Sequence, residues 1–308
     1  MEKIVIAAAN GFLGQKLIGY FSGRFEIVGL VRKPMEDTDG VRYVLWDGKT
    51  LGSWQLEIEG ALAVINLAGR SVDCRYTEEN KRQILDSRLQ STRVLGEAID
   101  LCDHPPSIWM NSASATIYAY SLDHPNSESD HTFGSGFSVD VCQQWEKIFF
   151  EHTYSNVRQI ALRITIVFGR EGGAYPVMRK LTRWGLGGKQ GPGNQMVSWI
   201  HIDDFCRAVD FLLTAEDVSG PVNMAAPNPL SNKEFMRLMR ESLGRSFGLP
   251  SPEFLLKIGA RIIQTETELI LKSRFVVPER LLNSGFSFEY PTMEEALRDL
   301  SNSGNETP

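Results

Sequence analysis

The chain of 308 residues has little of what marks metal-binding, secreted, membrane or nucleic-acid-binding proteins. It has four cysteines and no CxxC spacing, which suggests neither a zinc site nor a disulfide framework. No apolar run reaches the length of a membrane span, and the first residues lack the basic region and apolar core of a signal peptide. The net charge of -6 argues against a nucleic-acid partner. We therefore expect a cytoplasmic protein with reduced thiols, no metal, and neither a membrane nor a nucleic-acid partner; the cysteines are Cys74, Cys102, Cys142 and Cys206.

A complete glycine fingerprint for binding a dinucleotide is also missing. Residues Ile4 to Gly14 read IVIAAANGFLG: a strand-like apolar run breaks into a turn with Gly11 and Gly14, but Ala8 stands where the fingerprint has glycine. Small residues there would let backbone N–H groups and a helix N-terminus approach a pyrophosphate. The turn thus predicts a dinucleotide site in which the methyl group of Ala8 is tolerated if its φ is negative. A tight strand-to-helix turn with no ligand is the alternative.

Strands and helices alternate through the first half of the chain. This rhythm is typical of βαβ units and predicts a doubly wound (Rossmann) parallel sheet, with ligands at the carboxyl ends of the strands. A smaller C-terminal α/β substrate region would follow. We expect a dinucleotide-binding domain of residues 1–168 plus 197–226, and a substrate-binding region of 169–196 plus 227–308. The expected strands after the first are Glu26–Val31, Ala63–Leu67, Ser107–Asn111, Ile160–Val167, Val197–Ile202 and Val222–Ala225, and the main helices are Gln15–Phe21, Glu78–Ile99 and Val139–His152.

The end of the second expected strand bears on the choice of cofactor. A carboxylate there would bind the ribose hydroxyl of NAD, whereas arginine accommodates the 2′-phosphate of NADP. The strand ends in Val31, Arg32 and Lys33. These cations predict a preference for NADP(H) over NAD, with a solvated basic turn as the alternative.

Further segments carry a resemblance over nearly the whole chain. In order and spacing they resemble the extended, atypical branch of the short-chain dehydrogenase/reductase superfamily, within its NAD-dependent epimerase/dehydratase group. More narrowly, they are similar to a subgroup described as nucleoside-diphosphate-sugar epimerases and, in an older description, as cell-division inhibitors. The segments are INLAG (Ile65 to Gly69), ILDSRLQSTRVL (Ile84 to Leu95), SASATIY (Ser112 to Tyr118), LRITIVFGREGGA (Leu162 to Ala174), GLGGKQGPGNQMVSWIHIDD (Gly185 to Asp204), NMAAPNPLSNKEF (Asn223 to Phe235) and VVPERLLNSGFSFEYPTMEEAL (Val276 to Leu297).

The resemblance implies a set of cofactor-binding residues. The turn would hold the pyrophosphate, Asp47 would lie near the adenine, and Asn66, Ala68 and Gly69 would line the cofactor channel. Asp47 as the cap of a turn and Ala68–Gly69 as packing residues are the alternatives. In WIHIDD, we expect Asp203 to cap a helix that begins near Phe205, with His201 ordering the loop. The complete set is Ala8, Asn10, Gly11, Phe12, Leu13, Gly14, Arg32, Lys33, Asp47, Asn66, Ala68, Gly69 and Arg88.

The proton relay of this superfamily is not present in its usual form. The resemblance implies a serine and a Tyr-x-x-x-Lys pair, whose members share one helix face. Ser114 matches the serine, but VDVCQQWEK places Cys142 at the tyrosine position and Glu146 at the lysine position. A carboxylate one turn away would raise the pKa of a thiol where lysine would lower it. Cys142 stays a candidate catalytic residue, although packing and surface roles for Cys142 and Glu146 are the simpler interpretation.

Other side chains could take over these tasks. Tyr118 is a candidate catalytic residue and Tyr120 a candidate substrate-binding residue, because both follow Ser114; aromatic packing is the alternative for both. Guanidinium and ammonium groups could hold a substrate anion, and the resemblance points to Arg280 as a phosphate contact. The candidates for this anion are Arg88, Arg163, Lys180, Arg183 and Arg280.

Two functional hypotheses follow. The first is an epimerase-like oxidoreductase that binds NADP(H) and transfers hydride to or from a small, possibly nucleotide-linked, substrate. The second is a sensor or scaffold that binds NADP(H) without turnover, and the missing relay motivates it. The resemblance implies that the helical pair at residues 78–99 and 139–152 could form a homodimer interface, but nothing in the sequence establishes one.

Overall fold

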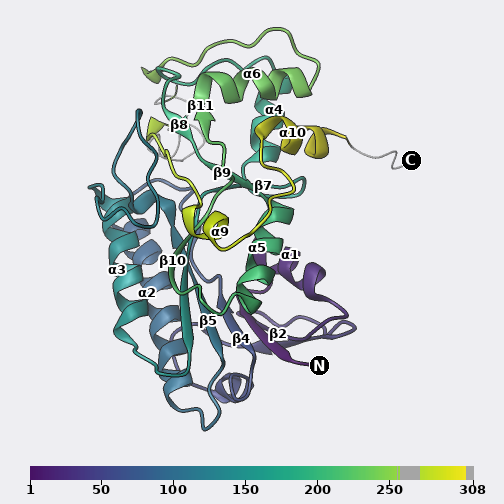
Figure 1. The fold of residues 1–308 in the computed structure, drawn as a ribbon, viewed down its shortest axis with the longest axis vertical. Helices are drawn as coiled ribbons and strands as arrows, with labels where there is room; N and C mark the ends of the chain where they lie inside the picture. The colour runs from purple at the N-terminus through teal and green to yellow at the C-terminus, as the bar shows by residue number, and fades with distance from the viewer. Residues whose placement is uncertain (255, 257–270, 303–308) are drawn as a thin grey trace.

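Seven parallel strands form the central sheet, in the order β10-β6-β5-β4-β1-β2-β3. The computed structural model describes residues 1–254, 256 and 271–302. The sheet confirms the predicted doubly wound fold, because the chain runs outward from β1 first to one side and then to the other (Figure 1). The strands are β1 (Lys3–Ala7), β2 (Glu26–Val31), β3 (Val41–Leu45), β4 (Ala63–Asn66), β5 (Ile108–Ser114), β6 (Arg158–Ile164) and β10 (Gly220–Met224).

Helices cover both faces of this sheet. Figure 1 shows α2 (Glu78–Asp100) and α3 (Phe137–Glu151) on one face, and α1 (Phe12–Phe21) and α5 (Ile202–Thr214) on the other. Successive side chains of β1 point to opposite faces of the sheet. Ile4 and Ile6 therefore pack with α1 and α5, whereas Val5 and Ala7 pack on the face covered by α2 and α3. Burial on both faces explains why the strands read as continuous apolar runs.

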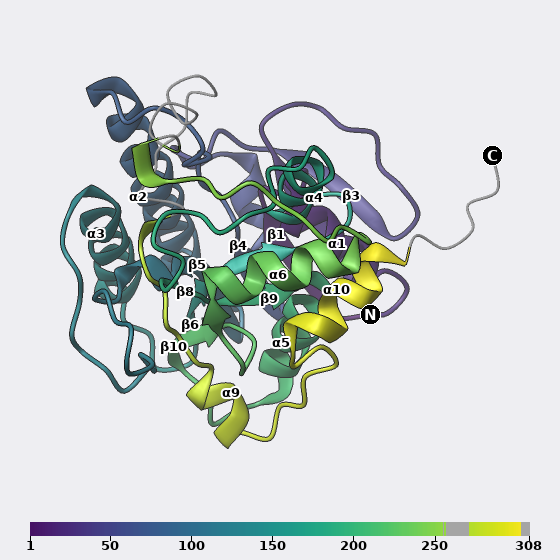
Figure 2. The ribbon, with the colours of Figure 1, turned by 90° about the horizontal axis from the view of Figure 1, so that it is seen from above.

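A smaller α/β region lies beyond the carboxyl ends of the strands. Viewed from above, α6 and α10 lie across the sheet (Figure 2). A separate core cluster joins these helices through side chains such as Phe168, Trp199 and Phe235. The elements are β7 (Ile166–Phe168), β8 (Met196–Val197), β9 (Trp199–His201), β11 (Leu230–Ser231), α4 (Tyr175–Arg183), α6 (Asn232–Ser242), α9 (Glu279–Asn283) and α10 (Met293–Ser301), beside the 3-10 turns η1 (Ser53–Glu57) and η2 (Ala115–Ile117) on the main domain.

Two expected strands prove to be two strands each. The run 160–167 breaks at Thr165, whose N–H and hydroxyl both donate to the carbonyl of Met224 at 3.2 and 2.7 Å, and β7 then joins β9 in a different sheet. The run 197–202 breaks at Ser198, and Ile202 already begins α5. The strand β3 was not predicted, because its residues alternate less regularly between apolar and polar.

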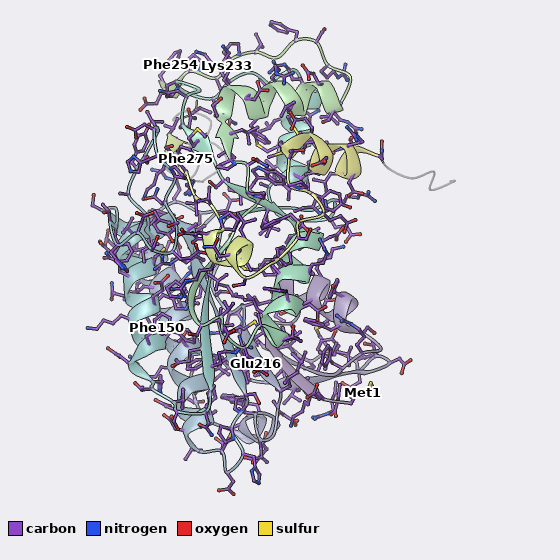
Figure 3. The ribbon with its side chains drawn as sticks, in the orientation of Figure 1. Met1, Phe150, Glu216, Lys233, Phe254 and Phe275 are labelled. Carbon is purple, nitrogen blue, oxygen red and sulfur yellow. The ribbon has the colours of Figure 1, made fainter. Side chains whose placement is uncertain are left out.

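The side chains mark the two ends of the molecule. Lys233 and Phe254 lie at the end formed by the smaller region, whereas Met1 and Glu216 lie toward the amino ends of the strands (Figure 3). Ligands of doubly wound sheets bind at the carboxyl ends, where the strand order reverses between β1 and β4. The predicted cofactor site should therefore lie around these two strand ends.

Candidate functional site

The turn after β1 adopts the shape of a nucleotide-binding turn. The backbone N–H of Ala8 donates to the carbonyl of Leu30 at 3.0 Å, and the N–H of Gly11 donates to the carbonyl of Ala8 at 2.9 Å. Gly11 is the N-cap of α1, and no side chain caps it. The first N–H groups of α1 therefore point into the space beyond the turn, as an anion site requires.

Ala8 does not have the negative φ that we expected. Its φ is +59°, and among the described residues it is the one non-glycine residue in the left-handed region. The fingerprint has glycine here because this conformation brings the β-carbon of other residues close to the following carbonyl. The turn thus keeps the backbone path of a glycine fingerprint while carrying a strained methyl group.

Gly14 allows the close approach between α1 and the turn. A β-carbon on Gly14 would lie 2.7 Å from the carbonyl oxygen of Ala9 and 2.8 Å from that of Ala8. Between the two glycines, the ring of Phe12 packs against Gly169 and Gly172. Asn10 and Gly11 are exposed, whereas Leu13 is partly buried. The turn fits a pyrophosphate, because Asn10 and Gly11 are exposed where α1 begins without a side-chain cap.

Arg32 and Lys33 are exposed directly after β2. Neither forms a hydrogen bond or an ion pair with another described residue. Asp47, by contrast, caps a turn: it accepts from the N–H of Thr50 at 2.9 Å and of Lys49 at 2.8 Å. The hydrogen bonds from Thr50 lower the pKa of Asp47. Two unpaired cations are thus available to a ligand, whereas the carboxylate is already occupied.

The side chain of Asn66 shapes the loop after β4 rather than lining a channel. It is fully buried, donates to the Asn111 side chain at 2.7 Å and accepts from the N–H of Ala68 at 3.0 Å. The prediction that it contacts cofactor is therefore revised. Ala68 is partly buried and Gly69 is exposed, with the guanidinium of Arg88 against Gly69.

A pocket of about 110 Å³ lies between α2, β5 and α3. Arg88, Ser114 and Cys142 all line it, so the structure brings together three of the residues predicted from the sequence. Trp145, Tyr76 and Thr116 line it too and were not predicted. Trp145 could have been found from its spacing of three residues after Cys142, which puts both on one helix face.

Cys142 is a protonated thiol in this pocket. Burial raises the pKa of Cys142 to about 11. The positive charge of Arg88 opposes this rise, and the negative charge of Glu146 adds to it. Ser114 caps η2 by accepting from the N–H of Thr116 at 3.2 Å, and its hydroxyl is also hydrogen-bonded to the side chain of Cys142. The pocket therefore offers neutral hydroxyl and thiol groups beside one guanidinium.

Glu146 is not a surface residue, contrary to our expectation. It is buried and forms a bidentate pair with Arg163, in which Nε and Nη2 each donate across 2.8 Å. Arg163 also donates to the hydroxyl of Tyr118 at 2.7 Å, and Tyr118 donates to Asn223 at 2.9 Å. The position that would carry the relay lysine thus carries an internal ion pair between α3 and β6.

This network revises two predictions. Arg163 is 3% exposed and Tyr118 2% exposed, and the polar ends of both are bound to protein groups. Burial also raises the pKa of Tyr118 to about 12, which makes the phenol a poor acid near neutral pH. Arg163 therefore does not reach a substrate anion, and Tyr118 is a packing residue with an internal hydrogen bond rather than a catalytic acid.

Arg280 lies at the wrong end of the sheet for the predicted phosphate contact. Its guanidinium donates to the carbonyl of Ser219 and lies against Gly220, the first residue of β10. Because β10 is parallel to the other strands, this is the amino end. Tyr120 is exposed beyond η2, and Lys180 lies over the ring of Trp184.

His201, not Asp203, caps α5. Its Nδ1 accepts from the N–H of Asp203 at 3.2 Å, and the helix begins at Ile202 instead of near Phe205. The buried Asp204, which was not predicted, accepts from the N–H groups of Glu289 and Tyr290 at 2.8 Å each. The WIHIDD segment therefore holds the C-terminal segment onto the main domain.

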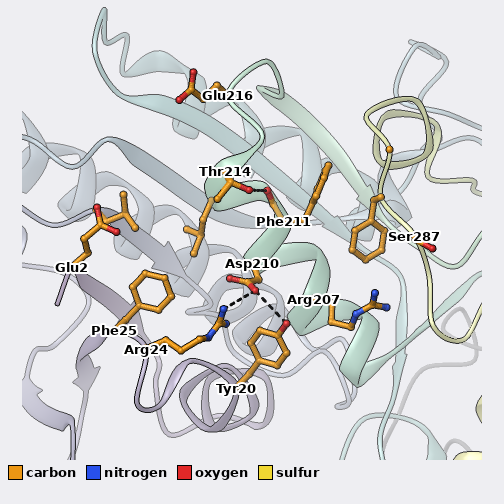
Figure 4. A pocket seen from close by; sticks show the side chains of 14 residues that line it. Glu2, Tyr20, Arg24, Phe25, Arg207, Asp210, Phe211, Thr214, Glu216 and Ser287 are labelled. Carbon is orange, nitrogen blue, oxygen red and sulfur yellow. Dashed lines mark hydrogen bonds and ion pairs between the residues drawn. The ribbon is translucent and has the colours of Figure 1, made fainter.

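A larger hollow, of about 690 Å³, lies between α1, α5 and residues 285–287 (Figure 4). The carboxylate of Asp210 there is bound by Arg24 at 3.0 Å and by Tyr20 at 3.3 Å. Glu2 and Glu216 line this hollow too, which places it at the amino ends of the strands. It is therefore not the site expected for the ligand of a doubly wound sheet.

Comparisons with known proteins agree on one family. A family model described as "NAD dependent epimerase/dehydratase family" matches residues 4–225, and a "Domain of unknown function (DUF1731)" matches residues 251–300. The epimerase family protein YfhF of Bacillus subtilis is 30% identical over 96% of this chain and 97% of its own length.

Solved structures give the same result. The crystal structure of the human epimerase family protein SDR39U1 with NADPH is 28% identical, with a TM-score of 0.87 over 98% of this chain and 99% of that one. A nucleoside-diphosphate sugar epimerase from Corynebacterium glutamicum is 25% identical, with a TM-score of 0.78 over 97% of this chain and 58% of that one.

None of the helices in the described part of this chain combines the length and the hydropathy that a membrane span needs.

Proposed function

The chain belongs to the NAD dependent epimerase/dehydratase family, and from that premise we propose that it is an epimerase-like oxidoreductase that binds NADP(H). NADP(H) supplies or accepts a hydride when bound. The observation that carries the proposal is the turn from Ala8 to Gly14, which is exposed at Asn10 and Gly11 and has no side-chain cap at Gly11, followed by Arg32 and Lys33, which pair with no described residue. The human relative crystallised with NADPH supports the same cofactor.

The backbone from Ala8 to Gly14 would hold the pyrophosphate, through N–H groups at the start of α1. Arg32 and Lys33 would bind the 2′-phosphate. Ala68 and Gly69 would border the nicotinamide half, because they follow β4 at the point where strand order reverses. We assign these contacts to residues 1–168 plus 197–226, and the substrate contacts to 169–196 plus 227–308 together with the pocket at Ser114.

Within the pocket, Ser114 would donate a hydrogen bond to the oxygen of a small, possibly nucleotide-linked, substrate. The proton that this oxygen gains or loses would be exchanged with a hydroxyl group of the pocket lining, such as Ser114 or Tyr76, because α3 has Cys142 and Glu146 at the positions of the usual tyrosine and lysine. Cys142 stays protonated and packs beside them. Trp145 and Phe137 limit the water that reaches these groups.

Binding of the cofactor tests the proposal directly. Fluorescence titration should give a lower Kd for NADPH than for NADH. In an R32A/K33A variant the affinity for NADPH should fall by about tenfold or more, because two charge-assisted contacts are lost, while the affinity for NADH stays nearly constant. The matched control is K233A/R245A, which also removes two exposed cations but from the smaller region, on α6 and shortly after it. Tighter binding of NADH by the wild type would refute the assignment.

The internal pair of Glu146 and Arg163 favours a second candidate, a sensor or scaffold that binds NADP(H) without turnover. In that case no compound in a broad panel of carbonyls and sugar nucleotides should oxidise bound NADPH. Binding of NADPH should instead change the oligomeric state, measured by light scattering with and without the cofactor. Turnover with any compound of the panel decides for the oxidoreductase.

A further inference from the structure

The described lining of the pocket at Ser114 carries a net positive charge. Among its described lining residues, Arg88 is the one charged side chain. Glu146 is close enough to influence Cys142, but its carboxylate is fully engaged by Arg163. Arg88 is partly buried, and a guanidinium that is partly withdrawn from water without a partner of opposite charge favours the binding of a ligand anion.

The hydrogen bonds of Arg88 leave one edge of its guanidinium available. Nη1 donates to the carbonyl of Arg70 at 3.0 Å and to that of Ile84 at 2.9 Å, which uses both of its hydrogens. No described group accepts from Nε or Nη2. These two nitrogens form the side of the fork that matches the two oxygens of a carboxylate.

The surroundings hold this fork in place. The guanidinium carbon lies 5.0 Å from the centre of the Trp145 ring, and the indole N–H donates to Thr92 at 2.9 Å, which fixes the ring. The carbonyl bonds fix the other side. Because the fork is already ordered, little rotamer entropy would be lost when a ligand binds.

Two more cations lie at the border of the pocket. Lys272 donates to the carbonyl of Thr116 at 3.3 Å, and Arg274 donates to the Thr116 hydroxyl at the same distance. Both groups add to the positive potential, which attracts an anion toward Arg88.

We propose that the free edge of Arg88 binds a carboxylate group of the substrate, so that the substrate class is a small oxo or hydroxy acid. This inference rests on the proposed function, because it places the acid beside Ser114. The volume of about 110 Å³ suits a carboxylate with a few carbons, since a water molecule takes about 30 Å³ of liquid. It also revises the prediction that Arg88 belongs to the cofactor contacts.

The test uses the protein saturated with NADP⁺, after NADPH and NADP⁺ binding have been measured on their own. Calorimetric titration then compares pyruvate with pyruvamide, which has the same shape without the charge. We expect pyruvate to bind about tenfold tighter or better. An R88Q variant should lose this difference and keep its affinity for NADPH, whereas R93Q, at an exposed arginine of the same helix α2, should keep both.

Each contrary outcome has one meaning. Equal affinity for pyruvate and pyruvamide in the wild type, or no binding of either, overturns the carboxylate site without any variant. Tighter binding of inorganic phosphate than of pyruvate, or a large loss of NADPH affinity in R88Q, assigns Arg88 to a phosphate or to the cofactor instead. Failure of the wild type to bind NADPH or NADP⁺ refutes the proposed function itself, before the acid is added.

Discussion

The strained residue of the nucleotide turn is Ala8. Its φ of +59° costs an L-residue about 1–2 kcal/mol. Glycine has no such strain, but it makes the unfolded chain more flexible, and this entropy offsets part of the stability that the relief of strain provides. Ala8 nevertheless keeps the carbonyl that accepts from Gly11. The local backbone is thus set by the fold around it and not by the preference of the residue.

We predict that A8G raises the free energy of unfolding by up to about 1 kcal/mol. Denaturant unfolding measures it. The control is A9G: the methyl group of Ala9 is fully buried and φ of Ala9 is not positive, so removing this methyl should destabilise. If A8G destabilised the protein as A9G does, the strain at Ala8 would be absent in solution.

The thiol of Cys142 makes stability depend on pH. Its pKa is about 11 in the folded protein and 9.0 in the reference state, so the folded state holds the proton more tightly. This contribution is complete below pH 9 and is lost as the pH rises from 9 to about 11. Between pH 8 and pH 10 we expect the free-energy advantage of wild type over C142A to shrink by about 1 kcal/mol. An advantage that stays constant over this range would contradict the raised pKa.

The departure at Cys142 and Glu146 could be recognised from the sequence, but its meaning could not. Spacing alone shows that the usual tyrosine and lysine are replaced. It does not show that Arg163 pairs with Glu146, because Arg163 comes from β6 and the two meet only when α3 packs on the sheet. An exposed and a buried carboxylate look alike in a sequence until a partner is placed beside one of them.

Helix α1 contains two glycines, of which one has no room for a β-carbon and the other has open space for one. Gly14 faces the carbonyls of the turn, where a β-carbon would lie 2.7 Å from an oxygen, whereas nothing lies within 4 Å of a β-carbon on Gly19. Both positions would gain helix propensity from alanine. Only at Gly14 does the collision with the backbone oppose that gain.

The prediction is therefore a pair of opposite results. G19A should stabilise by about 0.5–1 kcal/mol through helix propensity. G14A should destabilise by at least about 1 kcal/mol and weaken NADPH binding, because the turn must shift away from the helix. Thermal unfolding and NADPH titration measure both variants. Equal effects would mean that α1 does not approach the turn as closely as the structure has it.

Long elements were easier to predict than short ones. The helices α2 and α3 lie within two residues of their predicted ends, because many apolar positions repeat along each of them. The breaks at Thr165 and Ser198 interrupt apolar runs that continue on both sides. The change of sheet there depends on partners such as Met224 and Val276, which come from distant parts of the chain.

Across the whole molecule, Asp204 fastens the C-terminal segment. Its buried carboxylate accepts from two backbone N–H groups of residues 289 and 290 and from Arg207 at 2.8 Å. Asp203, its neighbour, is exposed in the first turn of α5. One of two adjacent aspartates thus carries a long-range connection.

We predict that D204A lowers the free energy of unfolding by about 3 kcal/mol, because two backbone N–H groups and Arg207 lose their buried acceptor. D203A should cost about 0.5 kcal/mol, through its interaction with the helix N-terminus. Calorimetry should show a clear loss of Tm for D204A alone. Similar losses in both variants would contradict the buried connection.

The residues of the candidate site could be placed only in part from the sequence, because the packing of distant segments decides which side chains face the pocket. The glycine turn was located from its local backbone chemistry, and Ser114 was located from the resemblance of the segment SASATIY. Arg88 was a candidate both for the cofactor and for a substrate anion, and Arg163 and Arg280 were candidates for the substrate, since a guanidinium has the same donors wherever it lies. The packing of α2 and α3 decides which of them faces the pocket and which is already paired.

The contact between Trp145 and Arg88 also has an optical consequence. An indole ring beside a cation, fixed at its N–H by Thr92, emits according to the charge and water around it. An anion that settles on Arg88 would change that field at the wall of the pocket. Trp145 is therefore an intrinsic fluorescent probe of the pocket. The part of the tryptophan emission that is absent in W145F would report whether the pocket is occupied, even by a compound that is never turned over.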